Sequence, residues 1–335
     1  MTKDNNRISP IAIMRNTYAV YPSFAMLAGM QLDVFTPLEG KSMDVGSLAK
    51  TLDVQADKLS PLLYALVTAG LLIVEDGVFS NTDEATRFLV RGRPEYMGGL
   101  AGFYSSLWQA TLKTSESIRT GKPQAKFDWM SLPKDDLIKY FKGQYPGSLS
   151  AGRQLAGKID FSRFKRLLDA GGGTGGVSIG ICETYPDLRA TVVDLPAVVS
   201  ISERFISEAG MSGRISVVAA DLIHSPPEGT YDIAILRALI QVLPPKDAQK
   251  ALMNISQVME PGSSIYIVGS VLDDTRLSPI ASIAFGLVFL NVYDDGRSYT
   301  EKEHRDLLSG AGFVDISIEH NAMSDGLGIV SARKP

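Results

Sequence analysis

A glycine-rich loop has the composition and spacing of a ligand-binding site. Residues 171–176 read Gly-Gly-Gly-Thr-Gly-Gly and satisfy the pattern G-x-G-x-x-G. Glycines let the backbone turn tightly and approach a ligand, and a following helix supplies N–H groups at its N-terminus. A strand is predicted at 166–170, just before the loop, and a helix from 177 to about 184. The pattern alone is weak evidence, so the acidic residues around it decide what the loop binds.

Three aspartates accompany the loop. Asp194 ends the next predicted strand, about 20 residues on, where a carboxylate can accept both hydroxyls of a ribose. Asp221 follows the third predicted strand and can meet an adenine edge. Asp169, immediately before the loop, suits a methionine moiety better than a pyrophosphate, which an acid would repel. The loop and Asp194 fit a nicotinamide cofactor and S-adenosylmethionine equally well. Asp169 and Asp221 favour S-adenosylmethionine.

The elements that must position these residues alternate between strands and helices. Such alternation predicts an α/β fold, a doubly wound, Rossmann-like parallel sheet with helices on both faces. Segments 314–319 and 328–332 differ, because a short polar loop joins them, and they predict an antiparallel hairpin at the sheet edge. The five parallel strands are predicted at 166–170, 190–194, 215–219, 231–236 and 264–268.

The first hundred residues predict helices and one small hairpin. An apolar helical stretch at 11–38, interrupted at Pro22, precedes a helix at 43–52 with Asp44 as N-cap and a second helix at 57–69. Asp76-Gly77 then joins two short strands. This order is that of a winged helix, which raises DNA binding. The second helix carries one basic residue, however, so packing against another subunit is favoured and no nucleic-acid partner is expected.

The middle of the chain, from 98 to 158, reads as helical with turns at 121–123 and 145–147. Its aromatic residues have two interpretations, core and inter-domain packing or a wall over a planar substrate. We therefore predict a dimerisation domain at 1–98, a helical linker and pocket region at 99–158, and a cofactor-binding domain at 159–335. The aromatic residues concerned are Tyr104, Trp108, Phe127 and Trp129.

Composition excludes several classes of protein. The 335 residues carry 33 Lys+Arg and 37 Asp+Glu, a net charge of −4, which argues against a protein that mainly grips phosphate backbones. The single cysteine, Cys182, excludes an intrachain disulfide and a cysteine zinc cage. His224, His304 and His320 are scattered and expected at the surface, so no metal site is predicted.

Membrane insertion is also not expected. The most apolar stretch, residues 279–292, is shorter than the roughly 20 residues that cross a bilayer, so it predicts a buried helix. No targeting signal is visible in the first ten residues. A cytoplasmic location is the resulting expectation.

Four strings resemble the S-adenosylmethionine-dependent small-molecule O-methyltransferases of the caffeic-acid, acetylserotonin and bacterial polyketide type. Residues 168–176 (LDAGGGTGG) and 185–196 (YPDLRATVVDLP) resemble its glycine loop and "YP…DLP" string. Residues 297–301 (RSYTE) and 307–313 (LLSGAGF) resemble its C-terminal motifs. The resemblance covers the whole chain. It implies a winged-helix dimerisation domain, a small-molecule substrate and an intertwined homodimer whose N-terminal parts help line the partner's active site.

The resemblance also implies roles for individual residues. Asp194 takes the ribose, with Leu195 beside it, and Asp221 and Leu222 lie by the adenine. Arg237 occupies the family's Lys/Arg position after the fourth strand. The methionine end of the cofactor is bordered by the loop and its acid, with cofactor-binding residues Asp169, Gly171, Gly172, Gly173 and Gly175.

The catalytic string departs from the family. The usual sequence R-H-V-L-H-D-W, whose second His removes the substrate proton, is replaced by RALIQVL at residues 237–243. Gln241 stands at the position of the base, and a carboxamide cannot take up that proton near neutral pH. Val242 and Leu243 replace the following Asp and Trp. The departure therefore extends beyond one residue.

Three interpretations of the missing base remain open. In the first, the substrate's nucleophile reacts without a base from the enzyme, because it is a ring nitrogen, an acidic phenol or enol, or an activated carbon. Alternatively, Asp294 or Asp295, beside Arg297, serves as the base, unless these acids form an ordinary turn. Thirdly, the chain has left methyl transfer and acts as a hydroxylase, decarboxylase or pericyclase.

The prediction chosen is S-adenosylmethionine-dependent O-, N- or C-methylation of an aromatic or polyketide-like small molecule. Proximity drives the reaction, with Gln241, Arg237 and Asp294 or Asp295 orienting the substrate. Besides a non-methylating enzyme, the alternative of a different class is a cofactor-binding regulator that acts through the winged helix.

Overall fold

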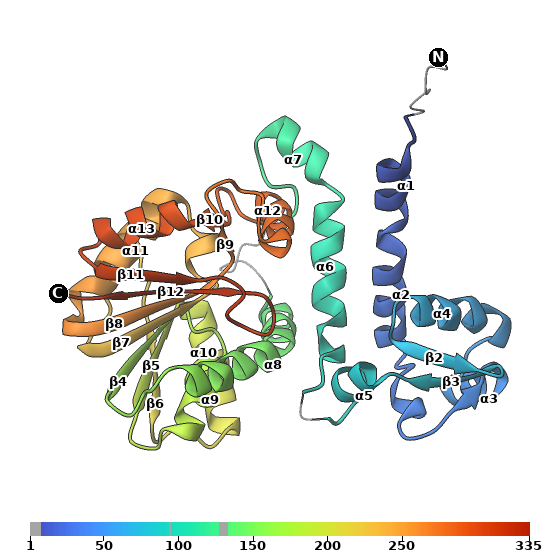
Figure 1. Cartoon of the computed structure of the whole chain (residues 1–335). Helices are drawn as coiled ribbons and strands as arrows, with labels where there is room; N and C mark the ends of the chain where they lie inside the picture. The colour runs from blue at the N-terminus through green and yellow to red at the C-terminus, as the bar shows by residue number, and fades with distance from the viewer. Residues whose placement is uncertain (1–7, 94, 127–132) are drawn as a thin grey trace, which may run out of the picture. The chain divides into compact units, whose positions relative to one another are not determined.

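The computed structural model describes residues 8–93, 95–126 and 133–335 (Figure 1). The chain divides into two compact units, residues 1–105 and 106–335, which are described separately below. The three-part division predicted from the sequence stays a prediction.

The first unit contains the predicted order of helix, helix and hairpin. Asp44 caps α3, because its Oδ1 accepts the Ser47 N–H at 3.0 Å. Asp76 and Gly77 both adopt left-handed φ angles, 47° and 80°, as the tight turn between β2 and β3 requires. The strand order is β1-β3-β2. The elements are α1 (Ile11–Tyr18), α2 (Val20–Gln31), η1 (Thr36–Leu38), β1 (Met43–Asp44), α3 (Val45–Leu52), α4 (Ala56–Thr68), β2 (Leu72–Glu75), β3 (Val78–Asn81), α5 (Asp83–Leu89) and η2 (Gly98–Leu100).

The interruption predicted at Pro22 is wrong. The break lies at Ala19, between α1 and α2. Pro22 sits in the first turn of α2, where its missing N–H removes no intrahelical hydrogen bond.

The second unit is a seven-stranded sheet of order β11-β12-β8-β7-β4-β5-β6, with helices on both faces (Figure 1). The predicted parallel strands and the antiparallel C-terminal hairpin are confirmed, and β12 pairs antiparallel with β8. Leu167 and Leu168 of β4 belong to different apolar cores, since successive side chains point to opposite faces. The strands are β4 (Arg166–Ala170), β5 (Arg189–Asp194), β6 (Ile215–Ala219), β7 (Tyr231–Arg237), β8 (Met259–Gly269), β11 (Val314–Glu319) and β12 (Gly328–Arg333).

Helices connect these strands and extend beyond the sheet. Two short strands, β9 (Val271–Leu272) and β10 (Tyr299–Thr300), form a separate parallel pair. The helix α6 (Ala101–Thr111) spans the boundary between the two units. The other helices are α7 (Thr114–Thr120), α8 (Lys134–Lys158), α9 (Gly176–Thr184), α10 (Pro196–Glu208), η3 (Ile240–Val242), α11 (Pro245–Gln257), α12 (Ile280–Val292) and α13 (Glu301–Gly310).

The turn predicted at 145–147 is wrong, whereas Gly121 does end α7 in the left-handed conformation. Residues 145–147 lie inside α8, which continues through Pro146. Packing against α9 holds this helix together. A Cβ added at Gly152 would lie 2.3 Å from the carbonyl oxygen of Val177. Tertiary packing of this closeness outweighs the local preference of a proline for a turn.

The helix predicted at 279–292 forms as α12, but the prediction that it is buried is wrong for the single chain. Ile280 is 81 % exposed and Leu287 is 45 % exposed. The buried positions include Asn291, whose Oδ1 accepts the Ser117 hydroxyl at 2.7 Å. A helix that is apolar all round leaves apolar surface uncovered wherever it lacks a neighbour. In the described part of the chain, no helix is long and apolar enough to span a membrane.

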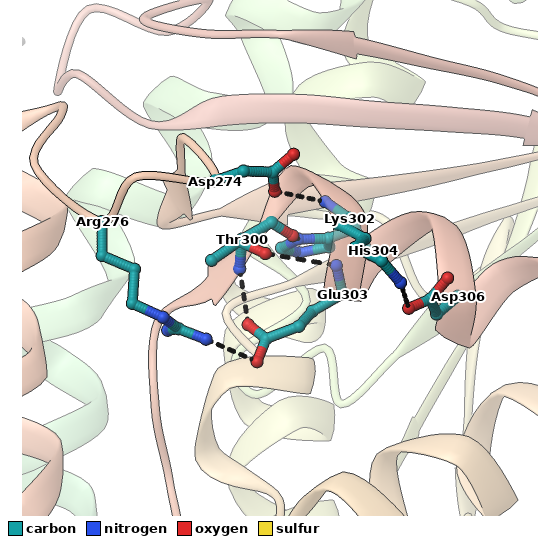
Figure 2. Close-up of polar contacts among 7 residues, drawn as sticks. All are labelled: Asp274, Arg276, Thr300, Lys302, Glu303, His304 and Asp306. Atoms are coloured by element: carbon teal, nitrogen blue, oxygen red, sulfur yellow. Dashed lines mark hydrogen bonds and ion pairs between the residues drawn. The ribbon is translucent and has the colours of Figure 1, made fainter.

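The surface position expected for His304 is also wrong. Its side chain is 3 % exposed, and its Nδ1 lies 2.9 Å from the Thr300 carbonyl oxygen at the start of α13 (Figure 2). Burial lowers the pKa of His304, which keeps the ring neutral. His224 is exposed, as expected, and His320 pairs with Glu301 at 2.7 Å. Among the described residues no group of three potential ligands could hold a metal ion.

The α8–α9 contact yields the first prediction. Gly152→Ala should lower the free energy of unfolding by about 2 kcal/mol, because the added methyl group meets backbone that cannot move aside. Gly157→Ala is the matched control on the same helix, since no atom lies within 4 Å of its added Cβ. It should be neutral or stabilising by up to about 1 kcal/mol. Urea unfolding measures both, and equal effects would contradict the packing argument.

Candidate active site

A cavity of about 370 Å³ opens at the carboxyl ends of the parallel strands β4, β5 and β7. This is the edge where doubly wound sheets bind ligands. All of its lining residues belong to the second unit. They are mostly apolar, with a few polar groups among them, as in small-molecule sites generally.

The glycine loop forms one wall of the cavity. Gly171 and Gly173 have φ angles of 67° and 57°, which favour glycine. The Gly171 N–H donates to the Val193 carbonyl at 2.8 Å. A Cβ at Gly171 would lie 2.9 Å from the Leu239 side chain, so even alanine would meet crowding there in addition to backbone strain. The loop therefore presents bare backbone to the cavity.

Asp194, at the end of β5, ties the loop to the next strand. Its Oδ2 accepts the Gly173 N–H and its Oδ1 accepts the Leu195 N–H, both at 2.8 Å. Burial raises the pKa of Asp194 against the effect of these two backbone donors. The remaining lone pairs of the carboxylate can accept further hydrogen bonds from a ligand.

Asp169, at the end of the loop's own strand, is fully buried. Its Oδ2 accepts the Ser178 hydroxyl at 2.7 Å and the Ser178 N–H at 3.3 Å. Its Oδ1 has no hydrogen-bond partner. Desolvation raises the pKa of Asp169 to about 6, partly opposed by Ser178. A buried carboxylate oxygen that lacks a partner in a ligand cavity marks the place of a donor group supplied by the ligand.

Arg237, at the end of β7, brings the opposite charge to the same cavity. Its side chain is 18 % exposed, and its Nη2 lies 3.5 Å from Asp325. Its Nε is buried and has no hydrogen-bond partner. Tyr140 and Gln144 of α8 also line the cavity, and the Gln144 amide donates to the Tyr140 hydroxyl at 3.3 Å. Tyr293 lines it after α12.

The structure brings most of the predicted cofactor-binding residues together. Asp221 is among them, and its Oδ1 accepts the Ile223 N–H at 3.0 Å. Gly175 does not line the cavity but adopts a left-handed φ of 72° at the N-cap of α9. The predicted residues that line the cavity are Asp169, Gly171, Gly172, Gly173, Asp194, Leu195, Asp221, Leu222 and Arg237.

The other predicted catalytic residues do not line the cavity. Gln241 Oε1 accepts the Ser270 N–H at 3.0 Å, and the Gln241 carbonyl accepts the Arg297 N–H at 2.8 Å. Asp294 is exposed and pairs with Lys126 at 2.5 Å. Asp295 and the Arg297 side chain are exposed.

Sequence reasoning placed pocket residues in the region 99–158, which contains α8, but it did not identify the individual residues of α8 that line the cavity. Tyr140, Gln144 and Ser148 recur every four residues along one helix face, with Phe141 next to Tyr140, but no motif marks them. Tyr104 and Trp108, from the predicted aromatic wall, do not line the cavity. Phe127 and Trp129 lie outside the described residues.

Comparisons with known proteins agree with this geometry. A family described as the O-methyltransferase domain matches residues 122–314, more than half of the chain, and one described as the O-methyltransferase dimerisation domain matches residues 14–91. The chain is 30% identical over 322 residues to 3-hydroxy-5-methyl-1-naphthoate 3-O-methyltransferase of Streptomyces sahachiroi, covering 92% of this chain and 91% of the relative.

Two further matches extend the likeness over nearly the whole length. The tetracenomycin polyketide synthesis 8-O-methyltransferase of Streptomyces glaucescens is 28% identical, covering 100% of both chains. The structure of human N-acetylserotonin methyltransferase in complex with S-adenosylmethionine shares the fold, with a TM-score of 0.81 at 21% identity, covering 98% of this chain and 99% of that one.

These matches confirm the predicted family, fold class, enzyme class and cofactor. None supports the non-methylating alternative. The glycine loop, its acids and the two matching domains all indicate the same family. The chain belongs to the O-methyltransferase family and has an N-terminal dimerisation domain of that family.

Proposed function

We propose that this enzyme transfers a methyl group from S-adenosylmethionine to a hydroxyl of an aromatic, polyketide-like small molecule. The observation that carries the proposal is the pair of unsatisfied buried atoms in one cavity. Asp169 Oδ1 and Arg237 Nε lie in its lining, beside a loop of bare backbone. The substrate class comes from the relatives named for a naphthoate and for tetracenomycin synthesis.

The residues present fit the cofactor. Asp194 would hold the ribose, and Asp221 with Leu222 would border the adenine. The unpartnered Asp169 oxygen suits the ammonium of the methionine end, because a buried carboxylate gains most from a charged donor. The left-handed Gly171 and the rest of the loop let that end approach the backbone. When bound, the cofactor supplies an activated methyl group for in-line displacement.

The chain's own contribution to the reaction is alignment and exclusion of water. Val242 and Leu243 present apolar surface to the cavity, and no histidine appears in its described lining. For Gln241 we propose an indirect orienting role. Its side chain and carbonyl bond to two neighbouring backbone segments, which holds the residues that follow it against the cavity. Asp294 likewise holds the segment after Tyr293 through its ion pair with Lys126.

We further propose that the molecule is a homodimer formed through the N-terminal unit. No residue of α1 is buried, although Ile11, Ile13 and Met14 are apolar. An eight-residue helix with no buried face is not stable alone in water. A nucleic-acid partner is disfavoured, because the one basic residue of α4, Lys58, already pairs with Asp57 at 3.0 Å.

The dimer is testable on the full chain. Light scattering should give twice the chain mass of 36.2 kDa, and Ile13→Glu should shift the protein toward the monomer. Met253→Glu is the control, because Met253 is also an exposed apolar residue, on α11 of the other unit. A wild-type monomer, or equal dissociation by both variants, would contradict the proposed interface.

The proposed reaction predicts that S-adenosylhomocysteine forms only in the presence of an acceptor. Incubation with methyl-labelled S-adenosylmethionine and hydroxynaphthoates should transfer label to an acceptor oxygen, detected by mass spectrometry. Acceptor conversion without S-adenosylhomocysteine would instead show a non-methylating enzyme.

Asp169 generates a prediction that separates stability from function. Its folded pKa of about 6 exceeds the ordinary 3.8, so the folded chain keeps a proton that the unfolded chain releases. The free energy of unfolding therefore falls as the pH rises from about 4 to about 6, and the loss is complete above that range. Asp169→Asn should stabilise the cofactor-free protein by on the order of 2 kcal/mol above about pH 7, with no gain below about pH 4.

The same substitution should weaken cofactor binding, because an amide cannot pair with an ammonium as a carboxylate does. Isothermal titration with S-adenosylhomocysteine should show at least about a tenfold loss. Urea unfolding at the two pH values measures the stability. A variant that is destabilised above pH 7, or that binds normally, would contradict the role given to Asp169.

A further inference from the structure

A second cavity, of about 340 Å³, opens at the opposite edge of the large sheet, where the parallel strands β4, β5, β6 and β7 begin. Its lining includes the first residue of each of these four strands. Among the described residues, none lines both this cavity and the cofactor cavity. The proposed methyl transfer makes no use of this second cavity, which we call the amino-edge cavity.

The floor of the amino-edge cavity is a polar part of the sheet face. The connection from β6 to β7, residues 220–230, contains no helix, whereas α9, α10 and α11 lie in the neighbouring connections. Thr191 of β5 and Ser216 of β6 are register partners, and their hydroxyls lie 3.2 Å apart in the lining. Two residues further along, Val193 and Val218 on the same face pack in an apolar core. The face therefore changes from apolar to polar toward its amino edge.

Three arginines line the amino-edge cavity, and two of them stand side by side. Arg166 begins β4 and Arg189 begins β5, and the two are register partners in the parallel pair. Like charges at paired positions of neighbouring strands destabilise a sheet. The third, Arg214, is committed to the fold, because its Nη1 donates to the Cys182 carbonyl at 2.8 Å. An anion bound between Arg166 and Arg189 would relieve their repulsion.

The contacts of this pair leave donors available for a ligand. The Arg189 Nη1 donates to the Gly213 carbonyl at 3.0 Å. Among the described residues, the Arg189 side chain has no other hydrogen bond and no ion pair. Arg166 forms an ion pair with Glu260 of β8. Arg189 is therefore the main candidate for binding an anion, since a guanidinium presents five N–H donors in a planar fork.

The chain supplies no counter-ion for Arg189. The described lining contains no Asp or Glu. Asp232 is close, but its two carboxylate oxygens accept the backbone N–H groups of Lys165 at 2.7 Å and Arg166 at 2.9 Å. Glu228 is exposed beside the cavity, where it reinforces the effect of burial in raising the pKa of Tyr231. Its charge would oppose an anionic ligand rather than replace one.

We propose that the amino-edge cavity binds a phosphate monoester, such as a sugar phosphate. A monoester carries between about −1.5 and −2 charges at pH 7 and offers three acceptor oxygens, which suit two adjacent arginines. The cavity extends beyond Arg166 and Arg189 over the hydroxyls of Thr191 and Ser216, which can bond to a hydroxylated organic part of the ligand. Binding at this edge leaves the cofactor cavity open, so the two ligands can be held at the same time.

Titration of the full chain with glycerol 3-phosphate tests the site. Saturating S-adenosylhomocysteine is present, so that the glycine loop is occupied and cannot take up the phosphate. Isothermal titration should show one site per chain. Arg189→Gln should weaken binding at least about tenfold, and Arg166→Gln should weaken it less. Arg204→Gln is the matched control, because Arg204 is an exposed arginine on α10 that pairs with Glu208.

Two further measurements examine the charge of the ligand. The affinity for glycerol 3-phosphate should fall below about pH 6, where the phosphate takes up its second proton. Dimethyl phosphate carries a single charge at every pH near neutrality and should bind at least about tenfold more weakly. Glu228→Gln should bind glycerol 3-phosphate more tightly than the wild type. Equal binding of the two phosphates would contradict recognition by a pair of arginines.

Urea unfolding without ligand separates binding from folding. Arg189→Gln should be as stable as the wild type or more stable, because it removes the repulsion from Arg166. A destabilised variant would show that Arg189 serves the fold and would overturn the proposal. So would equal binding by Arg189→Gln and the wild type, or no binding to the wild type at about 10 mM glycerol 3-phosphate. Binding only when S-adenosylhomocysteine is left out would place the phosphate in the cofactor cavity instead. None of these outcomes bears on methyl transfer.

Discussion

The close approach of backbone to backbone around the glycine loop is the constraint on which the rest of the site depends. Gly173 donates its N–H to Asp194, which joins the ends of β4 and β5. Directly behind the loop, α9 lies so near α8 that a Cβ at Gly152 would overlap the Val177 carbonyl. The same contact brings Tyr140 and Gln144, on the preceding turns of α8, into the cavity lining. Loop conformation, helix packing and cavity shape are therefore parts of one arrangement.

Two charged residues in the cavity lining, Asp169 and Arg237, each have a buried atom without a hydrogen-bond partner. The buried Asp169 has one oxygen bonded to Ser178 and one unsatisfied, and Arg237 has one edge near Asp325 and an unsatisfied Nε. Burying such groups without partners destabilises the fold, so their persistence is explained by a ligand that completes them. The cavity therefore offers a ligand one free acceptor on Asp169 and one free donor on Arg237. Its described lining contains no histidine that could act as a base.

Much of the fold could be predicted from the sequence, because its signals are local. Asp44 caps its helix through a neighbouring N–H, and Asp76-Gly77 makes a tight turn through its own φ angles. Predictions failed where distant contacts decided the outcome. Pro146 continues a helix because α9 packs beside it, and His304 is buried by its tertiary surroundings. The apolar α12 was expected to be covered, and the single chain leaves much of it exposed.

The sequence by itself determined the family, the cofactor and the absence of the usual base at Gln241, since each depends on residue types at fixed spacing along the chain. Only the tertiary structure decided that Gln241 turns toward Ser270, and that Arg237 stands with Tyr140 and Tyr293 in one lining. Arg237 ends β7, Tyr140 lies on α8 and Tyr293 follows α12, so no sequence periodicity relates these three residues. Their meeting follows from the packing of α8 and the segment after α12 at the carboxyl edge of the sheet, which sequence spacing does not encode.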